Sequence, residues 1–180
     1  ASGTVGTFKT GWVVECNRMI QNVGSSAIHY VEMIDHTGTT VRRNYFDGTG
    51  DSTNWGLVFR GFGGGSLNFI ERNGFQNQQN NSLVWIGSDF ATNTTGNITI
   101  QQNRLSTTIN NWNIAFDKPE NYTNSINVLN NFIRGVGSSN GVSLSAATAI
   151  THTFFTINNN SFENVSNGIN YTAPSSDTVC

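Results

Sequence analysis

An asparagine recurs along this 180-residue chain at intervals of 27 to 30 residues, and this spacing constrains the fold more than any other feature. Three positions before each asparagine stands an aliphatic residue, and two positions after it stands a large apolar one. A period of this size is typical of a solenoid, a propeller or another array of repeats. The six asparagines are Asn17, Asn44, Asn73, Asn103, Asn131 and Asn160.

A second apolar pair repeats in phase with the asparagines. Its first members are Ile28, Leu57, Leu83, Ile114, Val142 and Ile169, and its second members, two residues later, are Tyr30, Phe59, Trp85, Phe116, Leu144 and Tyr171. Alternation at period two indicates strands, and the helix formers Ala, Leu, Glu and Lys are scarce. We therefore predict an all-β parallel solenoid of about six coils, with roughly 28 residues per coil, although this spacing also permits a propeller with irregular blades.

The repeated asparagine has two properties that suit a solenoid. Its backbone tolerates the left-handed conformation, so we expect it at the tight turn of each coil. Its amide both donates and accepts hydrogen bonds, so identical residues in successive coils are predicted to form a continuous ladder. Glu15, Arg42 and Glu71 also share one position, two before the asparagine, which predicts a ladder of opposite charges. Arg43 and Arg72 follow one place later and need an acidic neighbour or a bound anion.

The repeat resembles the right-handed parallel β-helices of the pectate-lyase-like superfamily, which includes polysaccharide lyases, pectin hydrolases and phage tailspikes. The likeness extends from about Trp12 to Tyr171 and implies a right-handed winding. It implies one β-helix domain over residues 1–180, with terminal segments at 1–10 and 172–180. The frames that carry it are Val128-x-x-Asn131-x-Ile133 followed by Gly141-Val142, and Ile157-x-x-Asn160-x-Phe162 followed by Gly168-Ile169.

Composition narrows the classes of partner. The net charge of −2 gives no basic face for nucleic acid, and no run of 18 apolar residues predicts membrane insertion. Only 36% of residues are hydrophobic, but the 12 Phe, 4 Trp and 4 Tyr in register argue for a packed core rather than disorder. No capping helix is evident at either end, so we expect flanking domains or other subunits there. By resemblance to tailspikes, the assembly would be a homotrimer.

Most catalytic motifs of the resembled enzymes are absent. The segment Val31–His36 is similar to the Trp-Ile-Asp-His strand of pectate lyases, but the Arg-x-Pro-x-x-Arg motif is missing. The Asn-Thr-Asp, Gly-His-Gly and Arg-Ile-Lys patterns of pectin hydrolases are missing as well. We therefore expect His36 to be a solvated turn residue, and a secreted pectin-type enzyme is disfavoured.

Acidic residues gather in the loop that follows the second apolar pair. Asp89 and Glu120 each lie four residues past Trp85 and Phe116, which predicts a separation of about 5 Å in neighbouring coils. Such a pair, with Asp117 nearby, suits a retaining glycosidase or a Ca²⁺ site, and simple solvated loop charge is the alternative. Arg60 and Lys118 would then bind an acidic sugar. No other metal site and no cofactor are predicted.

Two tryptophans are candidates for stacking on sugars. Trp55 and Trp112 lie two residues before Leu57 and Ile114, at a position held by Ser26, Asn81, Asn140 and Asn167 in the other coils. Polar occupancy predicts an exposed turn, and two coils of separation predict a distance of roughly 10 Å. The alternative is that both rings fill gaps or contact a neighbouring subunit.

The two cysteines are not expected to pair. Cys16 and Cys180 are separated by about five coils, far beyond the distance of about 7 Å that a disulfide allows between Cα atoms. Cys16 is therefore expected to be a small buried thiol, and Cys180 to be free or bonded to another chain.

These observations favour a phage-tailspike-like β-helix that recognises bacterial surface polysaccharide outside the cell or on a virion. The glycan would be bound only, or also cleaved by hydrolase or lyase chemistry. The alternative is a non-catalytic structural or adhesive β-helix module of a virion or cell surface.

Overall fold

The computed structural model describes residues 9–21, 29–48, 55–62, 67–78, 84–87, 97–107, 112–117, 125–145 and 154–172. Within these ranges the chain forms strands and short bends, and no helix. The strands are β1 (Lys9–Thr10), β2 (Val13–Glu15), β3 (Arg18–Gln21), β4 (His29–Thr37), β5 (Thr40–Arg42), β6 (Tyr45–Gly48), β7 (Trp55–Phe62), β8 (Leu67–Glu71), β9 (Gly74–Gln78), β10 (Val84–Gly87), β11 (Asn97–Gln101), β12 (Arg104–Thr107), β13 (Trp112–Asp117), β14 (Ser125–Leu129), β15 (Phe132–Arg134), β16 (Asn140–Ser145), β17 (Phe154–Asn158), β18 (Ser161–Glu163) and β19 (Asn167–Thr172).

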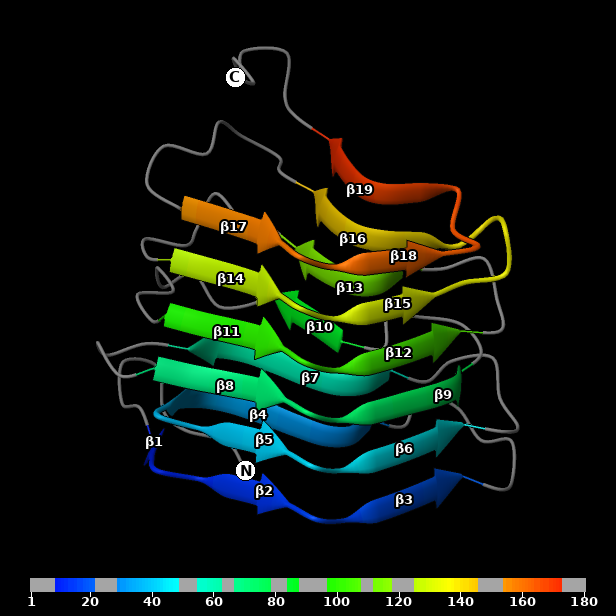
Figure 1. The fold of residues 1–180 in the computed structure, drawn as a ribbon. Helices are drawn as coiled ribbons and strands as arrows, with labels where there is room; N and C mark the ends of the chain where they lie inside the picture. Colours follow the sequence, from blue (N-terminus) through cyan, green and yellow to red (C-terminus); the bar gives the residue numbers. More distant parts are fainter. Residues whose placement is uncertain are drawn as a thin grey trace.

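Three parallel sheets wrap around one core (Figure 1). Sheet A has the order β1-β4-β7-β10-β13-β16-β19, sheet B the order β17-β14-β11-β8-β5-β2, and sheet C the order β18-β15-β12-β9-β6-β3. Each coil contributes one strand to each sheet, beginning with β2, β3 and β4. The structure confirms the predicted all-β parallel solenoid, with six such coils in the described residues.

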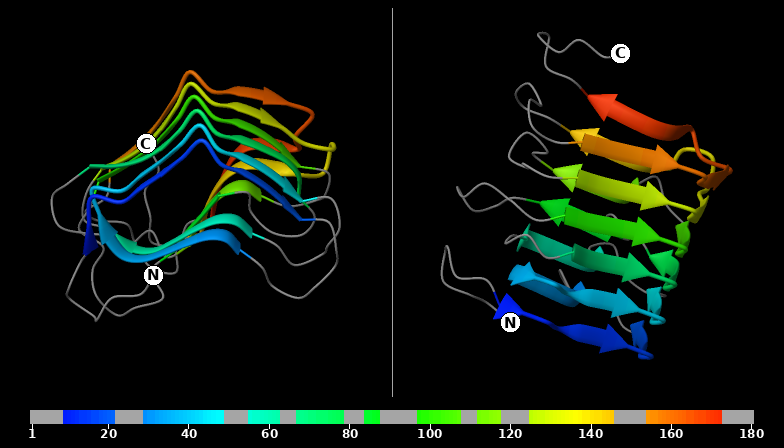
Figure 2. Two further views of the ribbon diagram at one scale, coloured as in Figure 1. Left: turned by 90° about the horizontal axis from the view of Figure 1, so that it is seen from below. Right: turned by 60° about the vertical axis from the view of Figure 1, so that its left-hand side comes forward.

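The winding is right-handed. In Figure 1 the strands of sheets B and C run from left to right at the front, and those of sheet A return behind them while the chain climbs from the bottom to the top. Seen along the stack, strands of one sheet superimpose from coil to coil (Figure 2).

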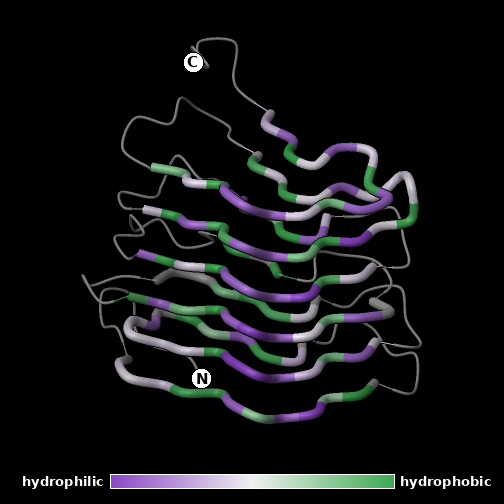
Figure 3. The backbone as a smooth tube through the Cα atoms, viewed as in Figure 1, coloured by the Kyte–Doolittle hydropathy of each residue, from purple (hydrophilic) through white to green (hydrophobic). Residues whose placement is uncertain are grey.

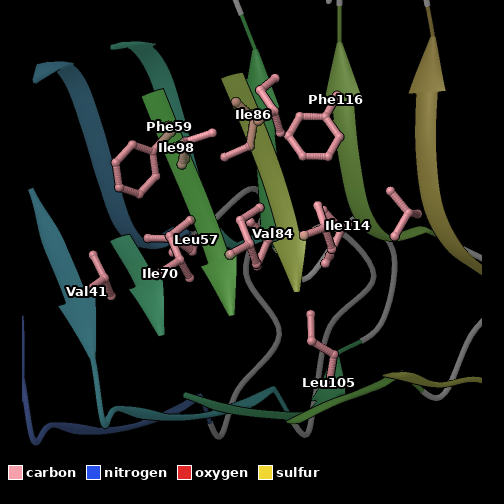
Figure 4. Packing of buried hydrophobic residues seen from close by; sticks show 14 of the residues in the cluster. Val41, Leu57, Phe59, Ile70, Val84, Ile86, Ile98, Leu105, Ile114 and Phe116 are labelled. Atoms are coloured by element: carbon pink, nitrogen blue, oxygen red, sulfur yellow. The ribbon is translucent and has the colours of Figure 1, made fainter. Parts of the chain in front are cut away.

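Two core columns follow the asparagine repeat as predicted. The aliphatic column pairs Val14, Val41, Ile70, Ile100, Val128 and Ile157 across sheet B. The second column pairs Met19, Phe46, Phe75, Leu105, Ile133 and Phe162 across sheet C. Their middle members are completely or almost completely buried, and Figure 4 shows aliphatic and aromatic side chains meeting between the sheets. Hydrophilic residues line up at the bends between sheets B and C (Figure 3).

The third core column, in sheet A, differs from the prediction in two coils. Phe59 pairs with Met33 on one side and Ile86 on the other, so Tyr30 and Trp85 do not belong to its column. Met33 and Ile86 are both buried. Trp85 lies in an apolar run in which either phase of the alternation satisfies the sequence pattern, and Val31 and Met33 offer the opposite phase to Tyr30. Strand pairing selects one phase in each case.

The six asparagines form the predicted ladder. In each step the Oδ1 of one asparagine accepts from the backbone N–H and the Nδ2 of the asparagine one coil earlier, at 2.9–3.1 Å. From Asn44 onward the Nδ2 also donates to a backbone carbonyl of the preceding coil, as Asn73 does to Val41. The four middle asparagines are buried and their amides are thus satisfied, which avoids the cost of stranded polar groups.

The left-handed turn residue is the one before each asparagine, so the predicted role of Asn in the turn was wrong. These residues have φ of 54–59° and are Cys16, Arg43, Arg72, Gln102, Asn130 and Asn159. The turn directs the following asparagine inward, where its amide joins the ladder. Cys16 is exposed at this position, which corrects the expectation of a buried thiol.

His36 also differs from its predicted setting. It lies in β4 and is completely buried. Its ring packs edge-to-face with the Trp12 ring, with 5.8 Å between the ring centroids. β4 extends to Thr37, so His36 lies within a strand where the sequence predicted a turn, and its side chain is buried.

Candidate functional site

The structure places only part of the predicted carboxylate site. Asp89, Lys118 and Glu120 lie outside the described residues. Asp117 ends β13 and is partly buried, and its backbone pairs with Gly87, which pairs in turn with Arg60. Arg60 and Asp117 therefore share one column of sheet A two coils apart, or about 10 Å.

The predicted alignment of Asp89 with Glu120 requires Trp85 to pair with Phe116, and these two residues do not pair. Trp85 pairs with Ala115, and Phe116 pairs with Ile86. The last described pair of these strands is Gly87 with Asp117. The pairing of β10 with β13 is therefore shifted by one residue from the predicted alignment.

The two predicted sugar-stacking tryptophans occupy equivalent backbone positions. Trp55 begins β7 and Trp112 begins β13, each two residues before a partner of Val84. Trp112 is in a strand and partly buried, which corrects the prediction of an exposed turn. The neighbouring Asn113 is fully buried and donates to the Asn140 carbonyl at 2.9 Å, so this strand end is packed.

A groove that the sequence analysis did not identify crosses the outer face of sheet C. Its volume is about 230 Å³. It spans four neighbouring strands, β6, β9, β12 and β15, and is lined by Tyr45, Gly74, Phe75, Gln76, Arg104, Ser106, Phe132 and Arg134.

One column of residues creates this groove, and it is the position directly after each ladder asparagine. The column reads Arg18, Tyr45, Gly74, Arg104, Phe132 and Ser161 in successive coils. Gly74 leaves a gap between the bulky side chains of Tyr45 and Arg104. A Cβ atom there would lie 3.2 Å from Cδ2 of Tyr45, so the tyrosine ring leans over the glycine.

Two arginine–aromatic pairs flank the gap. The Cζ atom of Arg18 lies 5.9 Å from the ring centroid of Tyr45, and that of Arg104 lies 5.3 Å from the centroid of Phe132. Exposed cation–π pairs contribute about 0.5–1 kcal/mol. Both arginines are exposed, and neither forms an ion pair with a carboxylate of the described residues.

The adjacent outward column is polar at the positions beside the groove. The Nε2 of Gln76 donates to Oδ2 of Asp47 at 3.1 Å, and the Nε of Arg134 lies 3.4 Å from Oε1 of Glu163. The strand pairing shifts between Leu105 and Thr107, which places Ser106 at an irregularity in the groove wall. No Asp or Glu of the described ranges lines the groove itself.

The predicted charge ladder lies at the bend between sheets B and C, away from the groove. Glu15 binds Arg42 at 2.9 Å and Arg43 at 3.1 Å. The hydrogen bond from Arg42 lowers the pKa of the Glu15 carboxyl, and the same bond raises the pKa of Arg42. Arg72 donates to Gln102 at 2.8 Å. Arg43 thus has an acidic neighbour, and no bound anion is needed there.

No family model, curated protein or solved structure matches this chain. Among the described residues, no group of three or more His, Cys, Asp or Glu is arranged to hold a metal ion. The same residues contain no helix long and apolar enough to cross a membrane. The fold and the groove define the protein as a parallel β-solenoid with an aromatic and cationic groove on one outer face.

Proposed function

We propose that this protein recognises an extended surface polysaccharide through the groove on sheet C. The observation that supports this function is the column in which the aromatic residues Tyr45 and Phe132 stand on the two sides of the Gly74 and Arg104 pair. Aromatic rings offer apolar faces to the C–H faces of sugar rings, while the arginines, Ser106 and Gln76 offer hydrogen-bond donors to hydroxyls. The groove supplies both kinds of contact side by side.

The dimensions of the groove favour a polymer over a small compact ligand. Tyr45 and Phe132 are three coils apart, which corresponds to about 14 Å at ~4.8 Å per strand. The groove is open and crosses parallel strands, so a chain longer than the groove can extend beyond both ends. A net charge of −2 argues against nucleic acid as that polymer. Bacterial surface polysaccharide, met outside the cell or on a virion, is the ligand class we favour, as in a tailspike-like module.

Cleavage of the glycan is a separate part of the proposal. The described lining of the groove contains no carboxylate pair, so it fits binding rather than acid–base chemistry. Any hydrolase or lyase activity would rest on Asp117 together with Asp89 and Glu120. Asp117 ends β13 of sheet A, and the other two residues follow β10 and β13 in the sequence. Binding and cleavage would then use different faces of the solenoid.

A second candidate function is a non-catalytic structural or adhesive module. One observation favours it: Ile169 belongs to a core column of sheet A and is 50% exposed in the last coil. Phe162 and Tyr171 of that coil are only partly buried as well. This coil end offers an apolar surface to a flanking domain or to another subunit, including those of a homotrimer.

Calorimetric titration against a panel of bacterial surface polysaccharides tests the binding function. We expect Tyr45→Ala and Phe132→Ala each to weaken binding by about 1 kcal/mol, the scale of an aromatic contact. Phe154→Ala is the matched control, because Phe154 is 74% exposed on sheet B and lies outside the groove. Equal losses in the control and the groove variants, or no binding to any glycan, would reject the proposal.

A further inference from the structure

We infer that the groove selects glycans that carry a negatively charged sugar and that Arg104 contacts the charge. This inference rests on the proposed function and names the class of ligand for the same site.

The charges around the groove are unbalanced. Among the residues that the structure describes, two arginines line it, Arg104 and Arg134, and no acidic residue does. One acid of the adjacent column, Asp47, is only 8% exposed and accepts a hydrogen bond from Gln76. Glu163 is engaged with Arg134. Among the described residues of the groove, the guanidinium of Arg104 is therefore the charge that no acid compensates, in a protein whose overall charge is negative.

Arg104 is held in place before any ligand arrives. Its guanidinium lies over the Phe132 ring, which restricts the side chain, and it forms no ion pair with an acid of the described ranges. A planar guanidinium binds carboxylate, sulfate or phosphate oxygens through two parallel hydrogen bonds. Because the side chain is already ordered, less conformational entropy is lost on binding.

Gly74 places the sugar ring next to this charge. Gly74 and Arg104 are direct partners on neighbouring strands, and Tyr45 stands on the other side of the glycine. A sugar ring over Gly74 would lie beside the Tyr45 ring, with its charged substituent toward Arg104. Gln76 and Ser106 line the same floor and reach the remaining hydroxyls.

Arg134 supplies a second, partly neutralised charge. Its ion pair with Glu163 is 3.4 Å long, and the two side chains are 54% and 51% exposed. Pairs of this kind are weak in water. An anionic sugar in the groove therefore competes with Glu163 for Arg134, and removal of the Glu163 charge should strengthen binding.

The shared chemistry is an anionic substituent on a sugar, and its source can be a carboxylate or a sulfate. Four probes separate these sources: oligogalacturonate, the same oligosaccharide after reduction of its carboxyl groups, dextran sulfate, and unmodified dextran. Each is titrated against the wild type, Arg104→Ala, Glu163→Gln and Arg72→Ala. Arg72 is an exposed arginine bonded to Gln102 outside the groove, so it controls for loss of a positive charge.

We expect the wild type to bind one or both anionic probes and to bind the neutral probes more weakly. Arg104→Ala should weaken anionic binding about tenfold, the size of one lost charge-assisted hydrogen bond. Arg72→Ala should leave binding unchanged, and Glu163→Gln should strengthen it. Binding of the anionic probes should also weaken as salt is raised.

Three outcomes overturn the inference, and they differ in what they say about the proposed function. Equal affinity for oligogalacturonate and its reduced form, with no binding of dextran sulfate, leaves a glycan-binding groove that ignores charge. Anionic binding that Arg104→Ala does not weaken places the charge recognition at another residue. If no probe and no bacterial polysaccharide binds, the proposed function fails together with the inference.

Discussion

The Oδ1 of Asn131 accepts two hydrogen bonds from Asn103, one from the backbone N–H and one from the Nδ2, each at 3.0 Å. The Nδ2 of Asn103 also donates to the Ile70 carbonyl at 2.8 Å, and its Oδ1 accepts from Asn73 in the same double manner. One side chain thus connects three coils, and its removal strands polar groups in the coils on both sides.

Asn103→Ala should therefore lower the free energy of unfolding by about 1–3 kcal/mol. The matched control is Asn127→Ala, because Asn127 lies in the adjacent strand β14 on an outward, partly buried position. Urea unfolding followed by circular dichroism measures both. A control that is destabilised as much as Asn103→Ala would show that the ladder has no special role.

The left-handed conformation of Asn130 predicts opposite tolerances for valine and glycine at this position. Asn130 has φ of 56° and is exposed, so its side chain is free of packing demands. Asn130→Val should destabilise the protein by about 1–2 kcal/mol, because a β-branched residue strongly resists this conformation. Asn130→Gly should change stability little, since glycine adopts positive φ readily. Similar unfolding midpoints for the two variants would contradict the assignment.

The two faces of sheet C predict opposite mutational effects. Phe75 is buried and stacks on Phe46 with 4.7 Å between ring centroids, so Phe75→Ala should cost about 3–5 kcal/mol of stability. Phe132 lies on the outer face, and Phe132→Ala should change the unfolding midpoint far less while weakening glycan binding. Thermal unfolding of both variants beside the titrations separates packing from recognition, and equal destabilisation would place Phe132 in the core.

The Glu15 site predicts a dependence of stability on pH. Arg42 lowers the folded-state pKa of Glu15 below its ordinary value of 4.5, so folding favours the ionised carboxylate. Its contribution to stability is present above pH 4.5 and is lost as the pH falls through the lowered folded-state pKa. The stability gap between the wild type and Glu15→Gln should accordingly narrow on acidification. High salt should shrink the gap as well, because the pair is at the surface. A difference in stability between the two proteins that grows toward low pH would contradict the lowered pKa of Glu15.

The proposed cleavage activity has its own test. The protein is incubated with a bacterial polysaccharide that it binds, and reducing ends are followed over time. If the carboxylates act as the sequence suggests, Asp89→Asn, Glu120→Gln and Asp117→Asn should each reduce cleavage without weakening binding at the groove. Cleavage that persists in all three variants removes these residues from the mechanism, and its absence in the wild type favours a binding or adhesive module.

The sequence repeat predicts which residues form the groove column, although not how their side chains are arranged. This column stands one residue after each ladder asparagine, so the repeat already aligns Tyr45, Gly74, Arg104 and Phe132. What the alignment lacks is the orientation of the side chains: the lean of Tyr45 over Gly74, and the placement of Arg104 on Phe132. Residues 28 to 30 positions apart became one site only when the coils stacked.

The sequence by itself determined the period, the asparagine ladder and the two core columns that flank it, because these depend on local alternation and on identical residues recurring at one interval. The tertiary structure decided which residues of β4 and β10 enter the core. Alternation permits two phases in an apolar run, and only pairing with β7 selects Met33 and Ile86 over Tyr30 and Trp85. It also decided where the chain turns, since the residue before each asparagine takes the left-handed conformation so that the amide can reach the coils above and below.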